Sequence, residues 1–329
     1  MSQEQDQRSG RLPLCADVSR NSGAQAHGSA HRWDTCIAFE ATVQEWEHFF
    51  DAERMSPAQR RAMQVLGDWA ESSGLGYGLL MFAPRDPSAF DPRQRRVRVY
   101  SRPPGPLASF QRQDFCADDE GLWALFSEHV AGVGHSAAEP LPHAAGSDWH
   151  LCTHGRVDSA CGKYGAALFQ TLCGEEPRLW RTSHFGGHRF APTLLELPAG
   201  RYWAYLTPEL TRQLARREGD WRALAECYRG CAGFGPAAQY ADAAAFREAG
   251  WWWLDAQREA EVLREDSSGF EVELRYWPHP NSPGHQNSAE PGRVRVQGEL
   301  TETLQLPASS HAPDLYPEPQ YRLTLVGDL

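Results

Sequence analysis

The residues of this sequence best suited to chemistry are two cysteines and two histidines, each pair set among glycines. Cys152 and Cys161 have eight residues between them, and His184 and His188 have three. Thiolate and imidazole groups together are the ligands of zinc and of some iron–sulfur clusters. These four residues are therefore the candidate metal ligands.

The spacing of the cysteines bears on which metal they would bind. Structural zinc usually takes cysteines that are two to four residues apart. The longer gap between Cys152 and Cys161 makes a wide loop that is better able to enclose something larger than one ion. From the residues alone, however, iron–sulfur and zinc stay equally open. His154, Arg156 and Asp158 lie inside the loop and are interpreted as groups that shape it around the ligands.

The flanking sequence predicts how these residues are positioned. Residues 149–151 are expected to form a strand that ends at Cys152, and residues 163–172 a helix with Cys161 at its amino end, where the helix dipole favours thiolate. Residues 178–181 should form a second strand that leads to the histidines. Gly186 and Gly187 place the histidines on a loop. A hairpin over 193–197 and 202–206 and a helix over 208–217 follow.

At these residues the sequence resembles the sucrase/ferredoxin-like family. The resemblance rests on the segments CTHGRVDSACGKYG and SHFGGHRFAPTLLELPAGRYWAYLTPE, and continues in Tyr228-Arg229-Gly230 and more weakly in Gly28-Ser29-Ala30. It implies a thioredoxin-like ferredoxin fold in which His-x3-His replaces the second cysteine pair. It also implies a 2Fe-2S cluster held by Cys152, Cys161, His184 and His188.

The rest of the chain suggests four parts of an α/β protein. They are a disordered tail (1–12), an N-terminal α/β domain (13–145), the thioredoxin-like 2Fe-2S domain (146–254) and a small antiparallel β unit (255–329). Segments 57–70, 78–82 and 97–101 predict a helix and two strands in the second part. One continuous helix is expected over 236–254. Alternating apolar and polar residues predict strands over 270–277, 293–300 and 321–326.

Composition narrows the class of protein. The 329 residues carry a formal net charge of −11, which argues against binding to nucleic acid or to an anionic membrane. The first eleven residues are polar and lack the apolar core of a secretory signal, so a cytoplasmic location is expected. Eight cysteines without such a signal do not indicate a disulfide framework. Cys15, like Cys36, Cys116 and Cys173, is interpreted as a small buried apolar residue, and Cys227 and Cys231 as packing residues.

These features predict an electron-transfer protein that works with a redox partner protein, either a reductase or an electron acceptor. A one-electron carrier is favoured over a stand-alone enzyme. A zinc-stabilised structural module and a thiol-dependent redox enzyme are the alternatives, although the sequence contains no Cys-x-x-Cys motif. Imidazole ligands retain a proton on the second ring nitrogen, so electron transfer is also expected to be coupled to protons.

Overall fold

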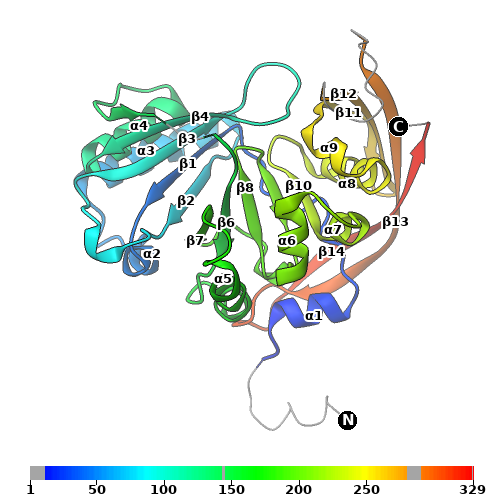
Figure 1. Cartoon of the computed structure of the whole chain (residues 1–329), viewed down its shortest axis with the longest axis horizontal. Coiled ribbons are helices and arrows are strands. Elements are labelled where there is room, and N and C mark those ends of the chain that lie inside the picture. The colour runs from blue at the N-terminus through cyan, green and yellow to red at the C-terminus, as the bar shows by residue number, and fades with distance from the viewer. Residues whose placement is uncertain (1–11, 143–144, 280–289, 328) are drawn as a thin grey trace.

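The computed structural model describes residues 12–142, 145–279, 290–327 and 329, and shows the strands of one large sheet with a second sheet at one end (Figure 1). All of the predicted tail except Leu12 lies outside these residues. The α-helices are α1 (Cys15–Asn21), α2 (Val43–His48), α3 (Pro57–Ser73), α4 (Asp119–Ala131), α5 (Ala166–Leu172), α6 (Pro208–Arg216), α7 (Arg222–Cys227), α8 (Pro236–Ala249) and α9 (Trp251–Asp255). The strands of the large sheet are β1 (Thr35–Glu40), β2 (Gly78–Phe82), β3 (Arg95–Ser101), β4 (Gln111–Ala117), β5 (Glu139–Leu141), β6 (Asp148–Cys152), β7 (Leu179–Thr182), β8 (Leu194–Leu197), β9 (Arg201–Trp203) and β10 (Tyr228–Cys231).

The large sheet contains the same strand arrangement twice. In the first half β2 is parallel to β1, β3 is antiparallel to β1, and β4 is antiparallel to β3. The second half has the same relationships. Here β7 is parallel to β6, β8 is antiparallel to β6, and β9 is antiparallel to β8. This order is that of thioredoxin-like folds, so the predicted fold class is confirmed. The two halves meet where β2 pairs antiparallel with β7, at Phe82 and Thr182. The predicted domain boundaries stay predictions.

The helix α3 illustrates how local sequence sets the element boundaries. The Ser56 hydroxyl accepts a hydrogen bond from the Gln59 N–H, and Pro57 occupies the first helical position. Both are helix-starting features, because the first turn has backbone N–H groups without helical partners. The helix ends at Gly74, which adopts the left-handed conformation. This predicted helix is confirmed.

The C-terminal part forms a separate antiparallel sheet of strands β11 (Gln257–Asp266), β12 (Gly269–Trp277), β13 (Gly292–Pro307) and β14 (Leu315–Val326), in that order. Phe270, Val272 and Leu274 alternate along β12 and are buried. The strand β11 was not among the predicted strands, because its residues are mostly charged and exposed, with little apolar alternation. The antiparallel unit itself was predicted correctly.

The predicted continuous helix over 236–254 is wrong, because the structure divides it into α8 and α9 at Gly250. Gly250 has φ of +79°, and a Cβ there would lie 2.8 Å from the Trp221 ring. Glycine therefore allows both the turn and the close approach. The break lets α9 bury Trp253 completely.

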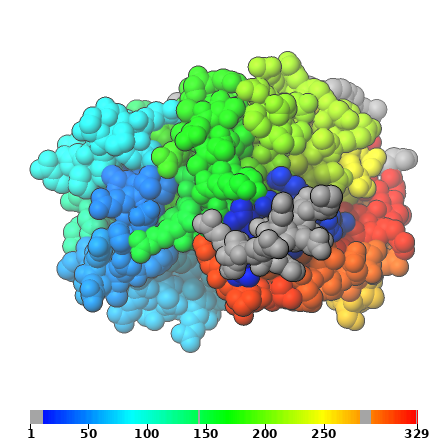
Figure 2. Space-filling model, turned by 90° about the horizontal axis from the view of Figure 1, so that it is seen from below, coloured from blue at the N-terminus to red at the C-terminus, as the bar shows by residue number. Residues whose placement is uncertain are grey.

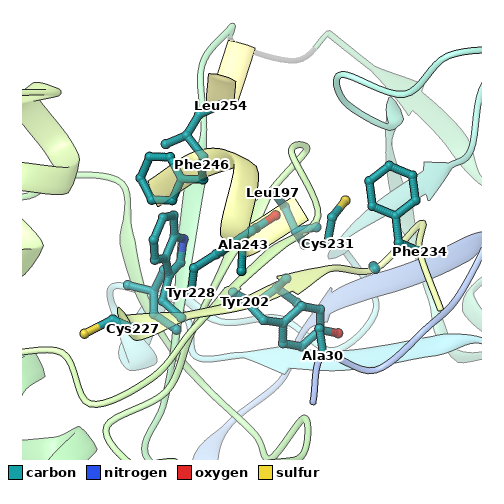
Figure 3. Close-up of a cluster of buried hydrophobic side chains, with 14 of the residues drawn as sticks. Ala30, Leu197, Tyr202, Cys227, Tyr228, Cys231, Phe234, Ala243, Phe246 and Leu254 are labelled. Carbon is teal, nitrogen blue, oxygen red and sulfur yellow. The ribbon is translucent and has the colours of Figure 1, made fainter. Parts of the chain in front are cut away.

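The helix α8 packs on the large sheet through small and aromatic side chains (Figure 3). Ala243 and Phe246 lie against Tyr228 of β10. The sulfur atoms of Cys227 and Cys231 point away from each other in this view, and both side chains are buried. Among the described residues neither belongs to a group that could hold a metal. Their interpretation as packing residues agrees with these positions.

A buried ion pair joins α8 to the C-terminal sheet. Asp242 accepts hydrogen bonds from Arg258 of β11 at 2.9 Å, from Trp253 of α9 at 2.8 Å and from Tyr228 of β10 at 2.7 Å. Asp242 and Arg258 are both fully buried. Removing one partner of such a pair is expensive because the remaining charge stays in the interior.

We therefore predict that Asp242→Asn lowers the free energy of unfolding by about 3–5 kcal/mol. The substitution keeps the shape of the side chain but leaves the Arg258 charge without its counter-ion. Guanidinium chloride unfolding measures the change. Asp220→Asn is the matched control, because Asp220 pairs with Arg222 at the exposed surface; its expected effect is under about 1 kcal/mol. Equal effects of the two substitutions would contradict the prediction.

Candidate functional site

The site is built on the end of β6 and the turn that follows it. Cys152 is the last residue of β6, where its N–H donates to the Thr193 carbonyl. Cys161 begins a single π-helical turn over Cys161–Gly165 that leads into α5. The sequence analysis predicted an ordinary helix from residue 163. A π turn inside a helix is rare and occurs often at functional sites.

Three of the four predicted ligands converge directly. The Nδ1 atom of His184 lies 3.7 Å from the Cys152 Sγ and 3.8 Å from the Cys161 Sγ. The donor atoms of the three side chains all lie within 4.8 Å of one another. Both thiols are buried at 1% exposure, whereas His184 is half-buried. This spacing is short enough for the three groups to share one metal centre.

The pKa values of the two thiols are shifted in opposite directions. Burial opposes ionisation of Cys152, but hydrogen bonds with Cys161 and His184 outweigh it and lower the pKa of the Cys152 thiol. The neighbouring Cys152 raises the pKa of the Cys161 thiol, and burial raises it further. A positive charge between the two sulfurs, such as a metal ion, would favour the thiolate form of both cysteines.

His188, the fourth predicted ligand, lies next to this group and has partners of its own. Its ring centroid is 5.3 Å from that of His184. Its Nδ1 atom lies 3.2 Å from the Asp158 Oδ2 and 3.3 Å from the Cys15 Sγ. A histidine that binds metal through one nitrogen commonly gives the other nitrogen to a carboxylate. His188 has this arrangement on its Nδ1 side.

Asp158 contacts residues from two distant parts of the chain as well as from its own loop. Besides His188, its carboxylate accepts hydrogen bonds from the Ser310 N–H at 2.8 Å, the Ser310 hydroxyl at 2.7 Å and the Ala160 N–H at 2.8 Å. Burial opposes ionisation, but these contacts, that of His188 foremost, lower the pKa of the Asp158 carboxyl. The carboxylate is therefore a fixed negative charge beside His188. The sequence analysis placed Asp158 in the loop but did not connect it to Ser310.

Cys15 is the site residue that sequence reasoning missed. It was interpreted as a small buried apolar residue, and burial does raise the pKa of its thiol to about 12. In the structure, however, Cys15 groups with Asp158 and His188. Figure 2 shows the α1 region, in blue, between the green segments of the second half and the orange C-terminal segments. No local spacing signals this contact, because Cys15 precedes His188 by 173 residues.

The loop that carries the histidines is supported from two sides. The Nδ1 atom of His154 accepts a hydrogen bond from the His184 N–H at 3.3 Å, which agrees with the predicted role of His154 in shaping the site. On the other side lies the buried Arg229 guanidinium, which donates to the Gly186 carbonyl at 3.1 Å and to the hydroxyl and carbonyl of Ser29. Arg229 thus links the Gly28-Ser29-Ala30 segment to the histidine loop.

Arg229 is also a buried cation close to the site. Among the described residues no carboxylate lies within ion-pair distance of it. Burial lowers the pKa of the guanidinium only to about 10, so it remains charged at neutral pH. A cation in this position stabilises negative charge that develops nearby.

Together, the fold and the site define a thioredoxin-like α/β protein with a buried group of cysteine and histidine side chains. The chain belongs to the sucrase/ferredoxin-like family, whose sequence model matches residues 26–230, more than half of its length. The match includes all four predicted ligands and ends before Ser310; Cys15 precedes it. No curated protein and no solved structure matches the chain. Within the described residues, no helix is both long and apolar enough to cross a bilayer.

Gly187 and Gly186 offer a test of how the histidine loop is held. Both have positive φ, but a Cβ on Gly187 would lie 2.4 Å from the Arg229 guanidinium, whereas a Cβ on Gly186 would meet nothing within 4 Å. We predict that Gly187→Ala displaces the loop and reduces bound metal per chain by half or more. Gly186→Ala should retain the metal and lose only about 1 kcal/mol of stability from its backbone conformation.

Elemental analysis of the purified variants measures the metal, and thermal unfolding measures the stability. Gly186→Ala is the matched control for the backbone cost. If both variants kept the full metal content, contact between Gly187 and Arg229 would have no part in holding the ligands.

Proposed function

We propose that this protein carries a 2Fe-2S cluster held by Cys152, Cys161, His184 and His188 and passes single electrons to or from a redox partner protein in the cytoplasm. The main support for this proposal is that two buried thiols and an imidazole converge at the end of β6, with a second imidazole beside them. When bound, a 2Fe-2S cluster accepts and gives up one electron.

The residues present fit such a group. Iron binding requires thiolates, and the hydrogen bonds of Cys152 with Cys161 and His184 lower the pKa of the Cys152 thiol toward that state. The carboxylate of Asp158 would hold a proton on His188 Nδ1 and so fix the ring with its Nε2 available as a ligand. The Arg229 charge and the two neutral imidazoles both favour the reduced state. The expected potential is therefore above that of plant-type ferredoxins.

A zinc ion is the second candidate. The three donor atoms of Cys152, Cys161 and His184 lie around one point, with two of the three separations at 3.7 and 3.8 Å. Three protein ligands and one further group suit tetrahedral zinc. A zinc module would be colourless and would contain no sulfide, so chemical analysis separates the two candidates.

We predict that anaerobically purified protein contains about two irons and two labile sulfides per chain. Cys152→Ala should lose the cluster, because it removes a thiolate from the centre of the site. Metal and sulfide analysis, with the visible absorption spectrum, makes the measurement.

Cys173→Ala is the matched control, since Cys173 is an exposed free cysteine at the end of α5. It should keep both the metal and the spectrum. One zinc per wild-type chain without sulfide would end the iron–sulfur proposal. An unchanged spectrum in Cys152→Ala would remove Cys152 from the ligand set.

Electron transfer here is further proposed to be coupled to protons, and the two histidines have unequal parts in it. The Nδ1 atom of His188 lies against Asp158, which fixes a proton there. His184 directs Nδ1 toward the thiols, and among the described residues its Nε2 has no hydrogen-bond partner. His184 also lines an open cavity, so a proton on its Nε2 can exchange with water.

We predict that the midpoint potential falls with rising pH, by up to about 59 mV per unit for one proton taken up with each electron. His184→Cys should abolish the slope, because it removes the exchangeable proton. His188→Cys should keep the slope, and it serves as the matched variant because it makes the same chemical change at the neighbouring ligand. Protein-film voltammetry between about pH 6 and 10 gives the slopes. If the midpoint potential of the wild-type protein did not change with pH, the coupling to protons would be contradicted. The histidines would then only set the value of the midpoint potential.

A further inference from the structure

A large cavity lies directly beside the histidine loop. Its volume is about 1100 Å³, and its wall includes Ser183, His184, Phe185, Gly186 and Gly187. Pockets for small organic molecules usually measure about 300–1000 Å³, so this cavity can hold a molecule of several fused rings. The thioredoxin-like halves form one side of it, and α8 and the C-terminal sheet form the other.

Aromatic side chains form much of this cavity. On the C-terminal side, Tyr240, Phe270 and Tyr321 pack against one another with ring centroids 4.9–5.8 Å apart. Trp46 and Phe50 line the opposite side. Phe50 is 72% exposed and Tyr316 50% exposed, although both are large apolar side chains. Rings on two sides of a cavity suit a flat, conjugated molecule.

The charge of the lining differs from that of the chain as a whole. Among the described residues, the cavity arginines Arg32 and Arg229 have no carboxylate partner, whereas Arg189 pairs with Glu318. Arg156 lies 4.0 Å from Glu47. Glu265 is the acidic lining residue for which the described structure shows no basic partner. The lining carries four arginines and four carboxylates, so its formal charge is zero in a chain of net charge −11, and the unpaired Arg32 guanidinium gives an anionic group a local partner.

We propose that this cavity binds a planar, conjugated small molecule that bears an anionic group, with its rings between the aromatic walls and its anion near Arg32. The proposal concerns binding and position. It goes beyond the proposed function and does not rest on it, since the contacts that hold the ligand do not require a metal. It also gives the C-terminal sheet a role, because Phe270, Tyr316 and Tyr321 come from that sheet.

The test uses anthraquinone-2-sulfonate, which is planar, conjugated and anionic, and isothermal titration calorimetry with the full chain. We expect one molecule per chain to bind. The neutral 2-(hydroxymethyl)anthraquinone should bind more weakly, and inorganic sulfate should not bind measurably. Titrations are repeated after iron and sulfide have been removed by chelation, so that binding is measured independently of the metal centre.

Two surface variants locate the site. Arg32→Gln and Phe50→Ala should each weaken binding of the sulfonate about tenfold, because they remove the charge and one aromatic wall. Both side chains are exposed, so folding should be unaffected. Arg60→Gln is the matched control: Arg60 is an exposed arginine of α3 outside the cavity, and its substitution should leave binding unchanged.

Absence of binding up to millimolar sulfonate would overturn the proposal. The proposal would also be overturned if Arg32→Gln and Phe50→Ala changed the binding affinity no more than the control Arg60→Gln does. Binding to protein that anaerobic purification itself yields without iron or sulfide would support the cavity while contradicting the proposed 2Fe-2S function, so the two failures are distinguishable.

Discussion

The buried carboxylate of Asp158 is the interaction on which the assembly of the site depends. It holds the imidazole of His188 on one side and Ser310, in the turn between β13 and β14, on the other. Ser310 in turn accepts a hydrogen bond from the N–H of Cys15, the first residue of α1. One fully buried negative charge thereby joins α1 and the turn between β13 and β14 to the loop between Cys152 and Cys161. Its cost of burial is offset by donors from each of these segments.

How much of this arrangement the sequence predicts depends on how far apart the contacting residues are. The four candidate ligands stand within one stretch of the sequence, and glycines and strand patterns around them indicate a loop site on an α/β fold. Contacts of Cys15 and Ser310 with Asp158 span 143 and 152 residues, and no periodicity or spacing encodes them. They follow from the packing of α1 and of the turn between β13 and β14, which depends on the whole fold.

Secondary structure shows the same division. The helix α3 carries its own start and stop residues, so its boundaries were predictable. The break between α8 and α9 depends on Trp221, which lies 29 residues before Gly250 and packs against it only in the folded chain. The strand β11 is charged along most of its length, and what makes it a strand is its pairing with β12. Tertiary contacts outweighed local propensity in both cases.

The repeated strand order gives the two halves of the large sheet comparable positions. Phe82 and Thr182 face each other where the halves meet, so Phe82 corresponds to Thr182, and their parallel-strand partners Glu40 and Cys152 correspond likewise. Two residues beyond these strand ends, Pro84 stands where the second half has His184. The first half therefore has the scaffold without counterparts of Cys152 and His184, and its Trp46, Tyr77 and Leu80 line the cavity instead. Because Cys152, Cys161, His184 and His188 all belong to the second half, substitutions among the first-half residues of the cavity can change its shape without replacing any of these four side chains.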